Sequence, residues 1–248
     1  MTAQKTQKQD PLIVIASNRG PFSFSRREDG KFDIQRGSGG LVTALGTLAE
    51  KQDVLWVAAA MSEGDRSWVE SQGAEEQDVQ GIRLKLFTPD ENAYHQYYHQ
   101  ISNPLLWFIH HQLWDSPRSP NITKETWDAW ENGYIKVNQQ IAEAIAESVA
   151  GEDRQVIIFP QDYQLYLVPE FLREKLGDRI HIQPFIHIPW PSHDTWSILP
   201  TAMRSRLLYS LLASNRLGFQ TRKDAFNFVQ TCRFFLPESS SQARSWAG

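Results

Sequence analysis

The strongest constraint on the fold of this chain is the regular alternation of short apolar runs with longer segments of helical periodicity. Apolar runs typical of buried strands lie at residues 12–17, 54–60, 81–87, 155–159, 179–188 and 216–220. Segments with a helical apolar repeat lie at residues 41–50, 92–114, 123–149, 163–176, 202–214 and 222–235. Strands and helices that alternate at this spacing are typical of an open, mostly parallel sheet with helices on both faces. The sequence therefore predicts an α/β fold, with the alternating run 81–87 at an edge and a helix break near Pro104.

The domain organisation predicted from the sequence is one domain at residues 12–236, because no linker divides the chain. The polar stretches 1–11 and 237–248 are expected to form a disordered N-terminal tail and a flexible C-terminal tail. The first stretch lacks the apolar centre of a signal peptide, and no apolar run reaches the roughly 20 residues that span a bilayer. These features predict a cytoplasmic protein with no membrane partner.

Charge and cysteine content exclude several further function classes. The formal net charge is −4, which gives no reason to expect nucleic acid as a partner. The single cysteine, Cys232, cannot form a disulfide within the chain and is expected to be buried on a helix face.

His95 and His99 are four residues apart without an evident third ligand, so no metal site is expected. Neither a G-x-S-x-G motif nor a carboxylate pair indicates a hydrolase.

Polar side chains follow several of the predicted strands at the point where each strand ends. Arg19 and Asp162 each come shortly after an apolar run, and His187 lies near the end of the run 179–188. In open parallel sheets, ligands bind at the carboxyl ends of the strands. We therefore expect an arginine, an aspartate and a histidine at one edge of the sheet, where they could hold a polyhydroxylated or phosphorylated ligand.

Each of these residues also has an interpretation that needs no ligand. Arg19 could pair with a surface carboxylate, Asp162 could cap the helix expected from Tyr163, and His187 could be a hydrogen-bonded core histidine. The loop RGSGG at residues 36–40 either lets the backbone approach an anion or forms a tight turn. Its spacing matches neither a P-loop nor a dinucleotide fingerprint, so the residues alone leave both readings open.

Six segments, taken in order, resemble the N-terminal half of trehalose-6-phosphate synthases. They are IASNRGP (15–21), GSGGLVTAL (37–45), YYHQISNPLLWFIHH (97–111), QDYQLYLVPEFLR (161–173), FIHIPWPSHDTWSILP (185–200) and LLASNRLGFQTRKDAFNFVQTC (211–232). That family comprises retaining glycosyltransferases of family 20, built from two Rossmann-like domains in the GT-B arrangement. The resemblance implies that this chain is the N-terminal, acceptor-side domain of such a fold.

The resemblance also implies a set of substrate-binding residues. Arg19 would contact the phosphate of the acceptor, whereas Gly39 and Gly40 would bring backbone N–H groups to the diphosphate of the donor. Tyr98 and Trp107 would line the acceptor pocket. The implied donor is UDP-glucose or another nucleotide-glucose, and the implied acceptor is glucose 6-phosphate or a related sugar phosphate. The resemblance implies no cofactor and no metal.

For the reaction itself, the resemblance implies roles for Asp162 and His187. Asp162 would hydrogen-bond to hydroxyls of the acceptor, and His187 would contact a hydroxyl of the donor glucose. In such enzymes the leaving diphosphate is thought to help deprotonate the acceptor. The protein would then contribute positioning and charge stabilisation rather than a carboxylate nucleophile.

Some positions depart from the pattern of the family. In QDYQL, Gln161 and Gln164 stand where two histidines are usual, which keeps hydrogen bonding but removes titration. In WVAAA, Trp56 is present, but Ala59 stands where a second tryptophan is usual. The loss of that ring on the acceptor side would suit another phosphorylated acceptor, or a pseudo-glycosyltransferase that forms a C–N bond.

The second, nucleotide-binding domain of the family has no counterpart in these 248 residues. The sequence therefore leaves open whether this chain is by itself an enzyme. It could be a fragment, a degenerate homologue, or half of a split enzyme that pairs with a chain carrying the C-terminal GT-B domain. The alternative function is that of a non-catalytic regulatory or interaction domain with the same fold.

Overall fold

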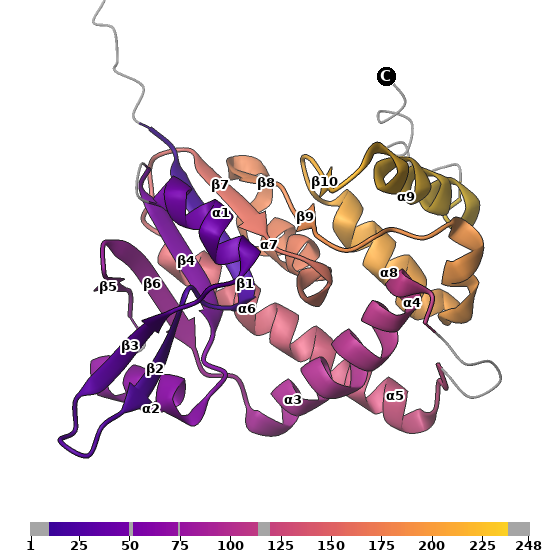
Figure 1. The fold of residues 1–248 in the computed structure, drawn as a ribbon. Helices are drawn as coiled ribbons and strands as arrows, with labels where there is room; N and C mark the ends of the chain where they lie inside the picture. Colours follow the sequence, from indigo (N-terminus) through magenta and orange to yellow (C-terminus); the bar gives the residue numbers. More distant parts are fainter. Residues whose placement is uncertain (1–9, 50–51, 74, 114–119, 238–248) are drawn as a thin grey trace, which may run out of the picture.

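A computed structural model describes residues 10–49, 52–73, 75–113 and 120–237, and its centre is a six-stranded sheet (Figure 1). The strand order is β5-β6-β4-β1-β7-β8. The strands are β1 (Leu12–Arg19), β4 (Val54–Ala59), β5 (Gln77–Val79), β6 (Ile82–Phe87), β7 (Val156–Pro160) and β8 (Ile180–Ile182). All neighbours pair in parallel except β5 and β6, so the predicted mostly parallel α/β sheet is confirmed.

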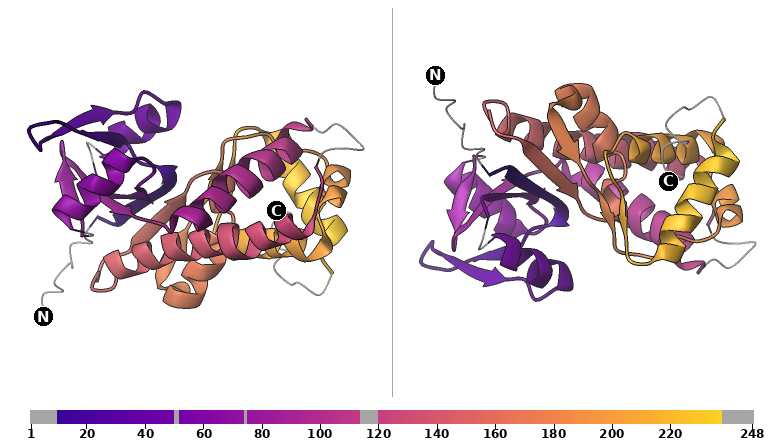
Figure 2. Two further views of the ribbon diagram at one scale, coloured as in Figure 1. Left: turned by 90° about the horizontal axis from the view of Figure 1, so that it is seen from below. Right: turned by 90° about the horizontal axis from the view of Figure 1, so that it is seen from above.

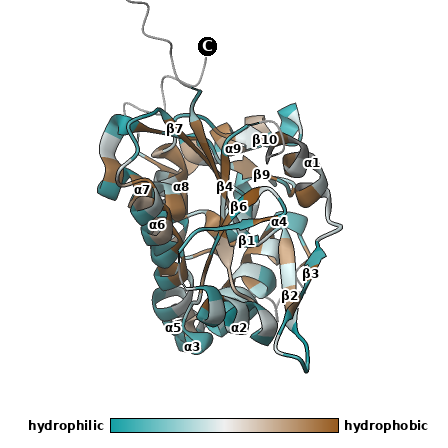
Figure 3. Cartoon of the chain, turned by 90° about the vertical axis from the view of Figure 1, so that its left-hand side faces the viewer, coloured by the Kyte–Doolittle hydropathy of each residue, from teal (hydrophilic) through white to brown (hydrophobic). Residues whose placement is uncertain are grey.

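The side chains of the central strands alternate between two apolar clusters, one on each face of the sheet. In β1, Leu12 and Val14 belong to the first cluster, whereas Ile13 and Ile15 belong to the second. The first cluster includes residues of α5 (Lys124–Ala129), α6 (Lys136–Ser148), α7 (Val168–Leu176), α8 (Thr201–Leu212) and α9 (Arg222–Phe235). The second includes residues of α1 (Gly40–Ala49) and α2 (Glu63–Gln72). Figure 3 shows the result, with hydrophobic strands inside and hydrophilic residues on the outer helix surfaces.

Two helical stretches contain π-helical segments that pack against each other. The first runs through α3 (Glu91–His95), η1 (Gln96–Trp107) and α4 (Phe108–His111); the second runs from α5 through η2 (Trp130–Ile135) into α6. The break predicted near Pro104 is wrong, because Pro104 lies inside η1, whose wider turns tolerate its missing N–H. The long helix predicted at residues 123–149 is confirmed.

A close approach between the two π-helical segments depends on Gly133 of η2. A Cβ atom placed on Gly133 would lie 2.5 Å from Cβ of Gln96 and 2.7 Å from the main-chain nitrogen of Tyr97. Both distances are shorter than van der Waals contact allows. The absence of a side chain at this position therefore lets η1 cross η2 at close range.

The strand predicted at residues 179–188 is interrupted. Only β8 pairs with β7; after Pro184, β9 (Phe185–Ile186) pairs in parallel with β10 (Gly218–Phe219) in a separate two-stranded sheet. Proline has no N–H for the ladder, which explains why the strand does not continue through it. The edge position predicted for residues 81–87 is also wrong, because β5 covers that side of β6.

A β-hairpin, which the sequence interpretation missed, consists of β2 (Phe22–Arg26) and β3 (Phe32–Arg36). The two views in Figure 2 show this hairpin and α1 on one side of the molecule and the C-terminal helices on the other. Gly30 takes a positive φ of 82° in the turn. The sequence did carry the signal, since Asp29-Gly30 lies between alternating apolar residues, a pattern typical of hairpins.

The predicted tails at residues 1–11 and 237–248 lie outside the described residues, apart from residues 10, 11 and 237. In the described part of the chain, none of the helices has both the length and the hydropathy needed to cross a membrane. Cys232 is buried, as predicted.

Candidate functional site

The loop after β7 holds Asp162 in a backbone conformation that is rare for residues other than glycine. Its φ is 70° and its ψ is −179°. Such a conformation costs about 1–3 kcal/mol and persists only where the surrounding structure imposes it. The main-chain N–H of Gln161 donates to the carbonyl of Ala16 in β1, and that of Asp162 donates to the carbonyl of Phe185 in β9, both at 2.8 Å. Hydrogen bonds to both neighbouring strands thus impose a strained backbone at a predicted site residue.

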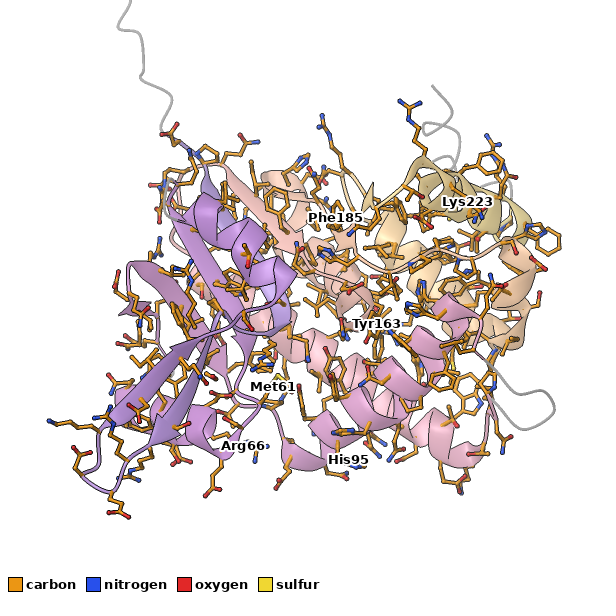
Figure 4. The ribbon with its side chains drawn as sticks, in the orientation of Figure 1. Met61, Arg66, His95, Tyr163, Phe185 and Lys223 are labelled. Carbon is orange, nitrogen blue, oxygen red and sulfur yellow. The ribbon has the colours of Figure 1, made fainter. Side chains whose placement is uncertain are left out.

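Asp162 and His187 lie next to each other at the carboxyl ends of β7 and β9. Oδ1 of Asp162 accepts hydrogen bonds from the main-chain N–H of His187 at 3.2 Å and from that of Tyr163 at 3.0 Å. Figure 4 labels Tyr163, the residue after Asp162, and Phe185, which lies two residues before His187. The structure therefore brings these two predicted residues together, and Asp162 also caps the helical turn η3 (Tyr163–Leu165), as the alternative interpretation expected.

Burial shifts the two acid–base groups of this pair towards their neutral forms. Burial raises the pKa of Asp162, and the nearby His187 opposes part of that shift. Burial lowers the pKa of His187, and the Asp162 carboxylate opposes part of that shift in turn. The pair therefore offers a ligand hydrogen-bonding groups in a partly desolvated setting.

His187 is half-buried rather than enclosed in the core. Its ring lies against Phe185, with the ring centroids 4.7 Å apart. Its Nε2 lies 2.9 Å from Oε1 of Gln161, which is itself buried. Gln161, one of the positions that depart from the family pattern, is thus a direct partner of the predicted histidine.

Arg19 and Gly39 line one hollow of about 550 Å³ at the carboxyl end of β1. The hollow is also lined by Gly20, Ser23, Gln35, Arg36, Gly37, Ser38 and Val42. Gly40 begins α1, whose first turn contributes N–H groups without helical partners. Two guanidinium groups, hydroxyl groups and a helix N-terminus favour an anion, and none of the described residues that line the hollow carries a carboxylate.

A second hollow, of about 310 Å³, lies beside the first and is also lined by Arg19. Ala59 pairs with Arg19 across β4 and β1 and lines this second hollow, together with Met61. Ala59 stands where the family usually has a tryptophan, so a methyl group borders the hollow in place of an indole ring.

The sheet brings the strands that carry Arg19 and Asp162 together, because β1 pairs with both β4 and β7. Among the described residues, however, no hydrogen bond or ion pair joins the side chain of Arg19 to Asp162 or His187. Arg19 is exposed at the end of its strand. The hollow lined by Arg19 and Gly39 and the Asp162–His187 pair are therefore neighbouring features rather than one hydrogen-bonded cluster.

Tyr98 and Trp107 both lie in η1 and are both half-buried, but they have different neighbours. The ring of Tyr98 stacks on that of Tyr94 with centroids 6.0 Å apart, and the Tyr94 hydroxyl donates to Oδ1 of Asn18 near the end of β1 at 3.1 Å. The ring of Trp107 lies 4.2 Å from that of His111. Tyr98 is thus linked to the sheet edge through one neighbour, whereas Trp107 packs at the far end of the same helix.

The hydroxyl of Tyr163 connects the loop after β7 to η1. It donates to Oδ1 of Asn103 at 2.8 Å, and the main-chain carbonyl of Tyr163 accepts a hydrogen bond from Tyr134 at 2.6 Å. The sequence interpretation missed the role of Asn103, because a polar residue inside a helix gives no sign of a partner 60 residues away. These bonds fix the positions of η1, through Asn103, and of η2, through Tyr134, relative to the loop that carries Asp162.

His110 anchors the turn that follows His187. It is almost fully buried, at 1% exposure, and its Nδ1 lies 2.7 Å from the carbonyl of Pro189. Its Nε2 lies 2.9 Å from the hydroxyl of Tyr166, and the rings of Trp190 and Trp196 contact it edge-on. Burial lowers the pKa of His110 to about 3. This histidine is therefore neutral and structural.

The sequence interpretation also missed the hairpin residues that line the larger hollow. Ser23 comes from β2, and Gln35 and Arg36 come from β3. Their contribution depends on the hairpin folding back beside α1, which the Asp29-Gly30 turn could have indicated. As for metals, the described residues contain no group of three histidine, cysteine or acidic side chains that could hold an ion.

Comparisons with known proteins point to one family. Residues 11–247 match the family model described as glycosyltransferase family 20. An α,α-trehalose-phosphate synthase [UDP-forming] of Emericella nidulans is 31% identical over 239 residues, which is 94% of this chain and 44% of that protein. A trehalose-6-phosphate synthase of Mycobacterium sp. is 32% identical over 244 residues, which is 97% of this chain and 46% of that protein. The chain thus spans less than half the length of these curated relatives.

The similar solved structures agree with this family. One described as "Trehalose-6-phosphate from E. coli bound with UDP-2-fluoro glucose" aligns with a TM-score of 0.68 and 26% identity, over 90% of this chain and 43% of that one. The Candida albicans trehalose-6-phosphate phosphatase N-terminal domain aligns with a TM-score of 0.69 over 95% of this chain and 46% of that one. Its identity is 22%, so this second likeness concerns the fold alone.

Proposed function

This chain belongs to glycosyltransferase family 20, and on that basis we propose that it is the acceptor-side region of a retaining glucosyltransferase. The reaction would move glucose from a nucleotide sugar, UDP-glucose or another nucleotide-glucose, to glucose 6-phosphate or a related sugar phosphate. The observation that supports this most directly is the contact between Asp162 and His187 at the carboxyl ends of neighbouring strands. A strained loop that places an acid beside a half-buried histidine is typical of a site that binds a ligand.

The proposal assigns the phosphate groups of the two substrates to the end of β1. The guanidinium of Arg19 would bind the phosphate of the acceptor through charge-assisted hydrogen bonds. The loop at Gly39 and Gly40 would receive the diphosphate of the donor at the N-terminus of α1. The hollow shared by Arg19 and Gly39 supports this assignment, because its described lining residues include two arginines and no carboxylate.

In the proposed reaction, Asp162 and His187 position hydroxyl groups and do not form a covalent bond with the sugar. Asp162 would accept a hydrogen bond from a hydroxyl of the acceptor. His187 would contact a hydroxyl of the transferred glucose. Fixed partners of this kind lower the barrier by orienting the substrates and by replacing the water that would otherwise solvate them.

The nucleotide of the donor requires further protein in this proposal. The chain spans 43–46% of the length of its relatives. We therefore assign recognition of the nucleotide to a second GT-B domain, either in the same protein or in a separate chain. The acceptor side would be formed largely by the residues described here.

The hollow beside Ala59 favours a second candidate for the acceptor. The hollow has a volume of about 310 Å³ and is also lined by Arg19. At position 59 the family usually has an indole ring. A phosphorylated acceptor larger than glucose 6-phosphate would fit an arginine with open space beside it. The same site would then transfer glucose to that acceptor, or couple it through nitrogen as in a pseudo-glycosyltransferase.

Isothermal titration calorimetry of this chain with glucose 6-phosphate, and separately with UDP-glucose, tests the proposal. We expect the sugar phosphate to bind to the chain alone, and glucoside to form once a C-terminal GT-B domain of the family is added. If no sugar phosphate binds, with or without that domain, the proposal is wrong. Binding without turnover in the assembled pair would instead support the non-catalytic regulatory domain.

A further inference from the structure

The side chain of Gln161 makes two hydrogen bonds that determine which way its amide points. Its Nε2 donates to the carbonyl oxygen of Phe159 at 2.9 Å. Its Oε1 lies 2.9 Å from Nε2 of His187. Gln161 is only 3% exposed, so water cannot readily replace either partner.

Only one orientation of this amide satisfies both contacts. If the amide were turned over, Oε1 would face the carbonyl oxygen of Phe159, and two acceptors would meet without a proton between them. An unsatisfied pair of this kind in a buried position costs about 1–3 kcal/mol. The amide therefore presents oxygen to His187, and an oxygen can only accept. It follows that Nε2 of His187 carries a proton.

The tautomer of the neutral imidazole then leaves a lone pair on Nδ1. Among the described residues, Nδ1 of His187 has no hydrogen-bond partner, and neither does Oδ2 of Asp162. Both atoms are accessible to solvent, because neither belongs to the fully enclosed polar atoms that have no hydrogen-bond partner. Two acceptor atoms thus remain open at the carboxyl ends of β7 and β9.

We propose that Gln161 is a positioning residue that fixes His187 in the Nε2–H tautomer and so directs the lone pair of Nδ1 to a hydroxyl of a bound sugar. His187 would then accept from that hydroxyl and would not donate to it. The identity of the ligand as a sugar rests on the proposed function, whereas the assignment of the tautomer rests on the hydrogen bonds alone. A histidine at position 161, as is usual in the family, could either accept from His187 or donate to it, and so would not impose one tautomer.

The tautomer can be measured on the full 248-residue chain by ¹⁵N–¹H long-range correlation NMR of the labelled imidazoles. A His187→Gln variant identifies the two ring signals of His187 among the seven histidines. In the wild type at neutral pH, we expect Nε2 to show the shift of a protonated ring nitrogen and Nδ1 that of an unprotonated one. A wild-type spectrum with the proton on Nδ1 would overturn the proposal.

Three substitutions distinguish a positioning role of Gln161 from a general contribution of this residue to stability. Gln161→Leu removes the acceptor and should give a mixture of the two tautomers of His187. Gln161→Glu keeps an oxygen towards His187 and, when its other oxygen is protonated and donates to the carbonyl of Phe159, should retain the Nε2–H tautomer; it also serves if the leucine variant does not fold. Gln164→Leu removes a matched glutamine three residues away and should leave the spectrum of His187 unchanged. A tautomer that stays fixed in Gln161→Leu would also contradict the proposal.

Titration with UDP-glucose, after addition of a C-terminal GT-B domain of the family, tests the part that concerns the ligand. In the wild type we expect the Nδ1 signal to move on binding, and the affinity of Gln161→Leu to fall only about twofold, because about half of the His187 rings would then carry the tautomer that can accept from the sugar. If the ligand binds and Nδ1 does not move, His187 is not the acceptor. If the wild type binds no sugar ligand, alone or with a C-terminal GT-B domain, the proposed function fails, yet the spectra still decide whether Gln161 sets the tautomer.

Discussion

The main-chain N–H of His187 donates to Oδ1 of Asp162 at 3.2 Å, and this bond joins two residues that are 25 positions apart in the chain. The bond ties the end of β9 to the loop after β7, where the backbone of Asp162 already departs from ordinary geometry. The acid thereby has one oxygen committed to holding the loop together. Its other oxygen remains available for a ligand.

The strained backbone at position 162 leads to a prediction about stability. Asp162→Gly and Asp162→Ala both remove the carboxylate, but only glycine adopts a φ of 70° with an extended ψ without strain. We therefore expect the glycine variant to be about 1–2 kcal/mol more stable than the alanine variant. Urea unfolding followed by circular dichroism measures the difference. Equal stability of the two variants would show that the backbone is not strained.

Arg19 should dominate the binding of anions at the end of β1. Replacing it by glutamine removes a charge-assisted hydrogen bond, and we expect the affinity for glucose 6-phosphate to fall at least about tenfold. The matched control is Arg26→Gln, which removes the same charge from an exposed position on β2. Calorimetry at two salt concentrations would measure both effects. An equal loss in the two variants would point to a diffuse charge effect in place of a specific contact.

His110 should make folding depend on pH in acid. The pKa of a histidine in the unfolded chain is about 6.5, whereas burial lowers the pKa of His110 to about 3. Between these values the unfolded chain binds a proton that the folded chain does not. The contribution of His110 is therefore fully present above pH 6.5, and the free energy of unfolding falls with decreasing pH by up to about 1.4 kcal/mol per pH unit.

The variant His110→Gln tests this dependence. It should be less stable at neutral pH by about 1–3 kcal/mol, because the bonds to Pro189 and Tyr166 are disturbed. It should also lose the part of the acid dependence that the histidine causes. Urea unfolding between pH 7 and pH 4 measures both, with the exposed His99→Gln as the control. If the slope of His110→Gln equals that of the wild type, His110 does not titrate on unfolding.

Gly133 should be required for the packing of the two π-helical segments. A methyl group at this position would overlap Gln96 and the backbone of Tyr97, so Gly133→Ala should destabilise the fold by about 1–3 kcal/mol. The control is Gly151→Ala, where nothing lies within 4 Å of the added Cβ. The midpoint of thermal unfolding should fall in the first variant and stay nearly constant in the second. A stable Gly133→Ala would mean that η1 can move away at little cost.

Several site residues could be predicted from the sequence because they follow apolar runs. Asp162 and His187 were placed at strand ends in this way, and the sheet does bring them into contact. The hairpin that lines the larger hollow was missed, although Asp29-Gly30 could have indicated its turn. The partner of His187 could not have been inferred, since nothing in the letters QDYQL says which glutamine faces the histidine.

The sequence by itself determined the α/β class, the main strands and helices and the family, because apolar periodicity and ordered motifs are local properties of the chain. Only the tertiary structure decided that β9 leaves the main sheet, that Asp162 takes a positive φ, and that Gln161 turns its oxygen to His187. Each of these depends on contacts between residues far apart in sequence. Such contacts arise only when the strands pack side by side and every buried donor must find an acceptor.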